Sequence, residues 1–129
     1  MKKTIKLILS IFLISISIYI LYCKFILKQS IIKIFGFAFL IVATGSMSPQ
    51  INPGELIIIK EYTNYQVGDI VTYKVDDEHL ITHRIIEKQD NQIITKGDFN
   101  NIVDDPININ QIQGKVIYQF KVLNSRGGA

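Results

Sequence analysis

One short segment of the chain combines the residue types that a serine nucleophile needs. It reads Thr44-Gly45-Ser46-Met47-Ser48-Pro49 and directly follows the apolar run 31–43. A serine at the end of a strand can project into a cleft with backbone N–H groups nearby, as nucleophilic attack and oxyanion binding require. An ordinary polar turn has the same composition, and the hexapeptide alone favours that simpler interpretation.

The chain contains two histidines, His79 and His83. On a strand they would share one face, roughly 13 Å apart at the usual rise per residue, which is too far for a shared metal site. His79 falls in a polar turn, whereas His83 lies between Ile81 and Ile85 in an apolar stretch. His83 is therefore a candidate base, although a histidine in such a place is more often structural.

A polar loop supplies candidate carboxylates. Residues 95–106 read TKGDFNNIVDDP and include Asp98, Asp104 and Asp105. These acids could cap backbone amides, bind calcium or orient an imidazole through its Nδ1–H. Calcium needs about six to eight oxygen ligands, and the run lacks the ligand order of an EF-hand. We therefore expect no metal and no cofactor.

The whole chain has 129 residues, of which 48% are hydrophobic and 19% charged, with a mean hydropathy of +0.26. This length allows one domain, and the hydropathy is high for a small soluble protein. The charged fraction excludes a disordered acidic or basic tail. A single cysteine, Cys23, excludes an internal disulfide and a cysteine-based zinc site.

The charge is unevenly divided along the chain. Residues 1–43 carry six lysines and no acid, net +6, and residues 44–129 have a net charge of −3. The basic excess surrounds an apolar run, so it does not argue for nucleic acid. The sequence also has no phosphate-binding loop, HExxH motif or aromatic–basic array. We expect no nucleic-acid partner.

The apolar run near the N-terminus predicts a transmembrane helix. Leu7 to Cys23 contains no charge, proline or glycine, and extension to Ile5–Leu27 adds only two lysines near the ends. A signal peptide has a shorter apolar core and a small-residue cleavage site, and a buried helix would need a larger protein around it. We expect an uncleaved anchor, whose orientation the flanking lysines leave open.

Strand and turn signals alternate after the anchor. The run 31–43 is too short to span a bilayer and favours a strand. The later expected strands are Leu56–Lys60, Asp69–Val75, Leu80–Lys88, Gln92–Lys96 and Gly114–Phe120. Five or six short strands predict a mainly β fold, a small antiparallel sheet or partly open barrel. The predicted parts are an anchor at 1–28, a β domain at 29–123 and a flexible tail at 124–129.

The order of the motifs resembles the type I signal peptidases (serine peptidase family S26), in the branch found in the endoplasmic reticulum, archaea and some Gram-positive bacteria. After the anchor come the hexapeptide 44–49, Gly68-Asp69-Ile70-Val71, Thr82-His83-Arg84-Ile85 and Thr95-Lys96-Gly97-Asp98. Each motif alone is weak, but together they cover the chain to about Phe120. The resemblance implies a membrane-bound serine endopeptidase that removes signal peptides from exported precursors.

The resemblance also assigns catalytic roles. Ser46 matches the nucleophile, and His83 matches the histidine that replaces the lysine base of the ordinary bacterial branch. The Ser46 N–H and the Thr44 hydroxyl would stabilise the oxyanion. Asp98 matches an acid that would support the loop or the Ser46 region. The acid that orients His83 is Asp105 or Asp104, with Asp105 slightly favoured.

Substrates, partners and location follow from the same resemblance. The substrates would be precursors with small residues, typically Ala, at positions −1 and −3, and Met47, Ile41 and Val42 are candidate pocket walls. The lipid bilayer is a second expected partner, and the resemblance leaves room for other secretion components. The protein would cross the cell membrane once, with its N-terminus cytoplasmic and the catalytic domain outside.

Two other classes of function are weighed against this one. A non-catalytic membrane-anchored β-domain that binds secreted or membrane proteins would keep Ser46 and His83 apart, with neither near Asp104 or Asp105. A self-cleaving repressor-type Ser/Lys protease would need a DNA-binding region and a lysine base. Residues 1–43 hold a predicted membrane span instead.

Overall fold

The computed structural model describes residues 1–27 and 31–121. Contacts divide the chain into two units, Met1–Ile32 and Lys33–Ala129, which are described separately. The domain boundary expected after residue 28 and the tail expected at 124–129 lie outside the described residues.

The first unit is a helix, α1, at Lys2–Phe25. Its 24 residues, with a mean hydropathy of 2.3 in the most apolar window, are long and apolar enough to cross a membrane. At 1.5 Å per residue the helix is about 36 Å long, against a hydrocarbon core of about 30 Å. Ser15 and Ser17 donate to the carbonyls of Ile11 and Leu13, at 2.8 and 2.9 Å, so these hydroxyls are satisfied within the helix.

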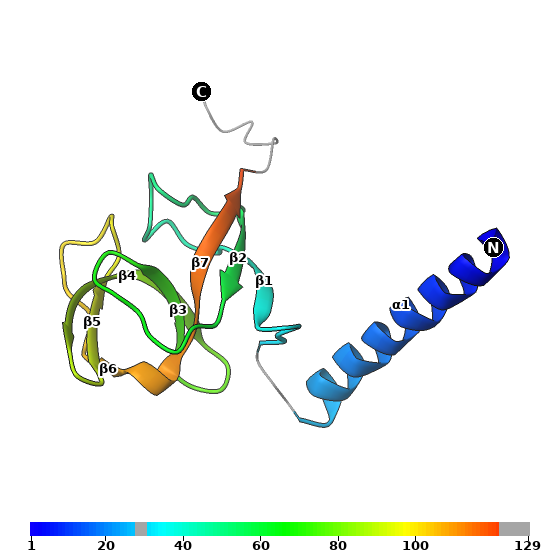
Figure 1. Ribbon diagram of the computed structural model, residues 1–129. Helices are drawn as coiled ribbons and strands as arrows, with labels where there is room; N and C mark the ends of the chain where they lie inside the picture. The colour runs from blue at the N-terminus through cyan, green and yellow to red at the C-terminus, as the bar shows by residue number, and fades with distance from the viewer. Residues whose placement is uncertain (28–30, 122–129) are drawn as a thin grey trace. The chain divides into compact units, whose positions relative to one another are not determined.

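The second unit is an antiparallel sheet whose strands follow the order β1-β2-β7-β3-β4-β5-β6. The sheet curls into a half-open barrel (Figure 1), which confirms the mainly β prediction. The strands are β1 (Phe37–Ile41), β2 (Leu56–Lys60), β3 (Ile70–Lys74), β4 (Leu80–Gln89), β5 (Gln92–Lys96), β6 (Ile107–Asn108) and β7 (Ile112–Phe120).

The structure differs from the predicted strands in two places. The apolar run 31–43 forms a strand only from Phe37, because Phe35 and Gly36 have positive φ values of 54° and 81° and make a tight turn. The two-residue strand β6 was not predicted, since it is too short for an alternating pattern to appear. A short 3-10 helix at Ile109–Gln111 leads from it into β7.

Alternation along the central strands builds the core. Val71 and Tyr73 of β3 pack with Ile85 of β4, Ile93 of β5 and Ile112 of β7, and all are at most 5% exposed. These strands position the site described below, because they fix the register of β4 against both neighbours.

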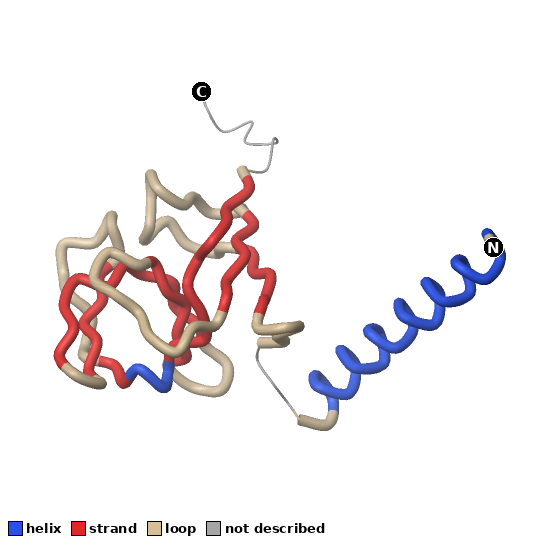
Figure 2. The backbone as a smooth tube through the Cα atoms, in the orientation of Figure 1, coloured by secondary structure: helices blue, strands red, loops and turns tan. Residues whose placement is uncertain are grey.

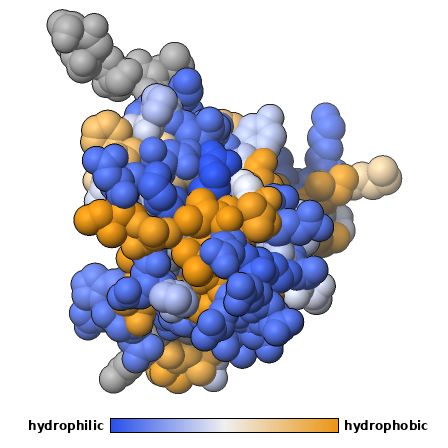
Figure 3. All heavy atoms as spheres, turned by 90° about the vertical axis from the view of Figure 1, so that its left-hand side faces the viewer, coloured by the Kyte–Doolittle hydropathy of each residue, from blue (hydrophilic) through white to orange (hydrophobic). Residues whose placement is uncertain are grey.

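The outer face of β1, β2 and β7 is apolar. The register aligns Phe39 with Ile58 and Tyr118, and Ile41 with Leu56 and Phe120. Phe39 and Tyr118 are 65% and 60% exposed. The opposite face of the same strands carries buried side chains, those of Ala38, Ile57 and Ile59. A band of apolar surface also crosses the view in Figure 3.

Candidate active site

Two loops meet at one end of the sheet, residues 42–55 between β1 and β2 and residues 97–106 between β5 and β6 (Figure 2). The Phe99 N–H donates to the Ser46 carbonyl at 2.9 Å, and the Asp98 N–H lies 3.4 Å from Met47 Sδ. These contacts join the serine hexapeptide to the acidic loop, although about fifty residues separate them.

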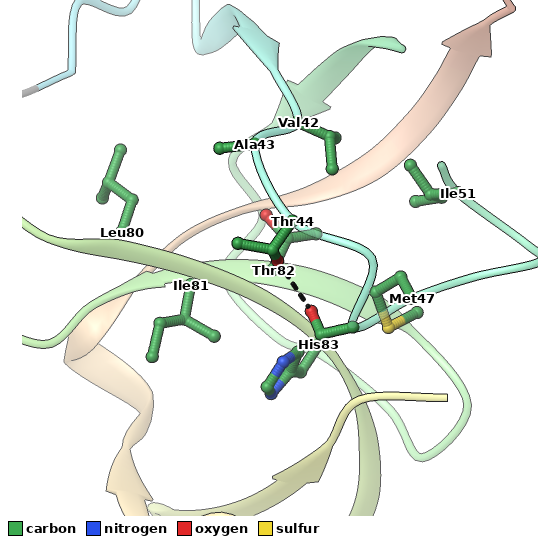
Figure 4. A pocket seen from close by; sticks show the side chains of 10 residues that line it. Val42, Ala43, Thr44, Met47, Ile51, Leu80, Ile81, Thr82 and His83 are labelled. Atoms are coloured by element: carbon green, nitrogen blue, oxygen red, sulfur yellow. Dashed lines mark hydrogen bonds between the residues drawn. The ribbon is translucent and has the colours of Figure 1, made fainter. Parts of the chain in front are cut away.

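A pocket of about 290 Å³ lies beside this junction (Figure 4). Residues 42–44, 46, 47 and 51 line one part of it, and residues 80–83 of β4 line the other. Leu80 to His83 pair with β3 alone, since pairing with β5 begins at Arg84. The pocket therefore borders a stretch of β4 whose second edge has no partner among the described strands.

Ser46 and His83 both line this pocket. The Ser46 Oγ lies 3.2 Å from Thr44 Oγ1, the hydrogen bond drawn as a dashed line in Figure 4. Within the described residues the Ser46 backbone N–H makes no hydrogen bond. The two expected oxyanion donors, the Thr44 hydroxyl and the Ser46 N–H, are thus neighbours at the pocket.

His83 is held from one side by a carboxylate. It is 6% exposed, and its Nδ1 is hydrogen-bonded to Asp104 Oδ2. A carboxylate accepts, so Nδ1 is the donor, and in a neutral imidazole Nε2 then keeps a lone pair. A Cβ built on Gly97 would stand 3.0 Å from this Nε2 and 2.6 Å from the Ser46 carbonyl. Glycine at position 97 thus allows the imidazole and the serine backbone to approach each other.

Asp104, and not Asp105, contacts His83, which corrects the slight preference for Asp105. The Asp104 N–H donates to the Thr95 carbonyl at 2.9 Å, which holds residue 104 beside β5. Its carboxylate also accepts from the hydroxyls of Thr95, at 2.8 Å, and Tyr73, at 3.4 Å. Asp105 is exposed. Counting six residues on from Asp98 selects Asp104, whereas the preference for Asp105 comes from matching the paired acids of the motif.

Asp98 supports the loop through a side-chain partner. Its carboxylate accepts from Arg84 Nε and Nη2 at 2.9 and 2.8 Å, and Arg84 Nη1 donates to the Gly68 carbonyl at 2.9 Å. The hydrogen bonds from Arg84 lower the pKa of Asp98, and in return they raise the pKa of Arg84. The ion pair ties the loop 97–106 to β4 and to the turn before β3.

Two of the three residues predicted as pocket walls line this pocket. Val42 and Met47 line the pocket, and Met47 is 1% exposed. Ile41 does not line the pocket: it is 65% exposed and aligns with Leu56 and Phe120 on the outer face. Ile41 is the last residue of β1, whereas Val42 begins the loop 42–55 that lines the pocket.

Three further site residues escaped the sequence analysis, namely Tyr73, Arg84 and Thr95. Arg84 and Thr95 stand within the motifs quoted above, but no pattern gave them partners. Tyr73 is found only through the register, which pairs β3 with β4. Among residues 1–27 and 31–121 no group of three His, Cys, Asp or Glu side chains could hold a metal ion.

Ser46 lies beside hydroxyl and N–H donors, and His83, bound to a carboxylate, lines the same pocket. This combination of groups is characteristic of the serine hydrolases. Residues 23–117 match the family model described as Peptidase S24-like, and the chain belongs to that family.

Curated relatives agree with this assignment. The chain is 40% identical over 78 residues to signal peptidase I W of Bacillus subtilis, an alignment covering 55% of this chain and 41% of the relative. It is 39% identical over 71 residues to the signal peptidase complex catalytic subunit SEC11 of Candida tropicalis, covering 50% and 42%. These relatives confirm the resemblance to signal peptidases, and the aligned part spans about 40% of their length.

Proposed function

We propose that this protein is a membrane-anchored serine endopeptidase that removes signal peptides from exported precursors. The observation that carries the proposal is the pocket that Ser46 and His83 line together, with His83 bound to Asp104 on its far side. The relatives named signal peptidase support the substrate class.

In the proposed mechanism Ser46 Oγ attacks the carbonyl carbon of the scissile peptide bond. His83 Nε2 takes the hydroxyl proton, and Asp104 stabilises the imidazolium that forms. For this step the Ser46 side chain rotates away from Thr44, which releases the Thr44 hydroxyl. That hydroxyl and the Ser46 N–H then donate to the oxyanion, where one such donor is worth about 2.7–4 kcal/mol.

The tetrahedral intermediate then collapses to products. His83 returns the proton to the leaving amine, the C–N bond breaks, and the signal peptide stays attached to Ser46 as an ester. A water molecule, deprotonated by His83, attacks this ester. Ser46 regains its proton as the signal peptide leaves with a free carboxylate.

The open strand edge supports binding of an extended peptide. The unpaired side of Leu80 to His83 can hydrogen-bond to a peptide backbone, as in strand addition to a sheet edge. The walls supplied by Val42, Met47 and Ile81 are apolar. They suit uncharged residues before the cleaved bond better than charged ones.

The proposed location is the cell membrane, crossed once by α1, with the N-terminus in the cytoplasm and the β domain outside. An apolar helix long enough to span supports the anchor. Precursors are cleaved after translocation, and this sets the orientation. External protease added to spheroplasts should digest the β domain and spare an N-terminal tag, and the reverse result would reject this topology.

The proposal is tested with full-length protein in detergent and a purified precursor. We expect one cleavage after the signal sequence, and Ser46→Ala and His83→Ala should each lower kcat by roughly 10⁶-fold, the loss seen for such residues in a related mechanism. Acidification should also abolish cleavage, because imidazolium cannot accept the serine proton. Undiminished cleavage by folded Ser46→Ala protein would reject the mechanism.

A further inference from the structure

The Asp104 carboxylate has two hydroxyl neighbours to which the proposed mechanism gives no role. Thr95 Oγ1 lies 2.8 Å from Asp104 Oδ2, the Tyr73 hydroxyl lies 3.4 Å from the same oxygen, and the two hydroxyls lie 3.2 Å apart. His83 Nδ1 binds that oxygen as well. Three donors therefore converge on one carboxylate oxygen.

Both hydroxyls are buried, Thr95 at 0% and Tyr73 at 2% exposure. They come from the two strands that flank β4, since β3 pairs with β4 on one side and β5 pairs with it on the other. Burial raises the pKa of Tyr73, and the nearby Asp104 charge raises it further, so its phenol stays protonated and able to donate. Buried polar groups are nearly always hydrogen-bonded, so these two hydroxyls are held in place by their hydrogen-bond partners.

We propose that Tyr73 and Thr95 are positioning residues whose hydroxyls fix the Asp104 carboxylate and thereby set the orientation and basicity of His83. The idea rests on His83 being the base of the proposed function. The positive end of each O–H dipole points at Oδ2, which weakens the negative potential that the carboxylate exerts on the imidazole. Removing either hydroxyl therefore favours the protonated imidazole.

Other charged groups act on the same imidazole. Asp98 in the loop 97–106 interacts electrostatically with His83, and Lys96 at the end of β5 interacts with Asp98. Arg84 pairs with Asp98 at 2.8 Å, which leaves a local dipole rather than a free charge. Removing the Tyr73 or Thr95 hydroxyl changes none of these three groups.

The test follows the Cε1–H resonances of both histidines by NMR during a pH titration of the full-length protein in detergent. Tyr73→Phe should raise the titration midpoint of His83 by roughly 0.5 pH unit, and Thr95→Val should raise it more because its hydroxyl is closer. Thr95→Ser, which keeps the hydroxyl, should restore the original midpoint. The exposed His79, paired with Asp76, serves as an internal reference that should not move.

A matched control is Tyr65→Phe. Tyr65 is also 2% exposed, but its hydroxyl accepts from the Tyr62 N–H at 3.0 Å, whereas the Tyr73 hydroxyl donates to Asp104. Loss of stability alone would affect both tyrosine variants and leave His83 unmoved. An unchanged midpoint in Tyr73→Phe, or an equal shift in Tyr65→Phe, overturns the proposal. The titration needs no substrate, so it decides this point even if the protein fails to cleave precursors.

Discussion

At the scale of single residues, Asp104 and Asp105 are adjacent in the chain but lie in different surroundings. The Asp104 carboxylate accepts hydrogen bonds from His83, Thr95 and Tyr73, whereas Asp105 is exposed. Asp104→Asn should reduce kcat by about 10⁴-fold, because an amide can stabilise the wrong imidazole tautomer, as in other serine proteases. Asp105→Asn should change kcat by less than about threefold. Precursor cleavage by the two purified variants compares them directly, and a larger loss in Asp105→Asn would contradict this assignment.

At the scale of elements, the loop 97–106 is fastened to β4 by the Arg84–Asp98 pair. The hydrogen bonds from Arg84 hold the pKa of Asp98 below its ordinary value of 3.8. A depressed carboxylate pKa stabilises the folded state above that ordinary value, and this stabilisation is lost as pH falls through the folded-state pKa. Both side chains are partly exposed, at 33% and 23%, so we expect about 1 kcal/mol or less from the pair.

Asp98→Asn should therefore lower the Tm at neutral pH, and the difference from the unmodified protein should shrink below pH 3.8. Thermal unfolding in detergent, followed by circular dichroism from pH 7 downward, measures this difference. Asp77→Asn is the matched control, because Asp77 pairs with Lys74 at 3.6 Å while fully exposed. A Tm difference for Asp98→Asn that stays constant into strong acid would refute the electrostatic explanation.

The elements also explain which features could be predicted. The strands β2 to β5 are short runs rich in β-branched residues and bounded by turn residues, so their sequences reveal them within one or two residues. The start of β1 depends on positive φ values at Phe35 and Gly36, and local hydrophobicity does not encode them. Ser46 and His83 follow from motif order. The inward turn of Asp104 and its contact with Tyr73 depend on strand register, which a single sequence does not contain.

On the molecule as a whole, α1 is one exposed apolar surface, and the outer face of β1, β2 and β7 is another. Soluble monomers rarely expose so continuous a patch. A patch of this kind marks a surface that contacts another protein or a membrane.

The edge of the outer face has the chemistry of a membrane interface. Lys60 and Lys115 are opposite each other in the register, next to the apolar rows. Lys60 Nζ lies 5.4 Å from the Phe37 ring centroid and 5.1 Å from that of Tyr62. Lysines beside aromatic rings place their charge at anionic headgroups while their stems lie on apolar surface. We therefore expect the outer face to rest on lipid.

The absence of tryptophan from the sequence gives this expectation a direct test. In anionic vesicles the Tyr118→Trp variant should emit at shorter wavelength than in water, and lipids brominated on their acyl chains should quench it, because the side chain lies on the outer face. Ile86→Trp is the control, since residue 86 is exposed on β4, outside that face. If lipid contacts the outer face, the two variants differ in quenching. Equal, water-like emission from both variants would mean that the outer face stays in solvent and that α1 alone holds the protein to the membrane.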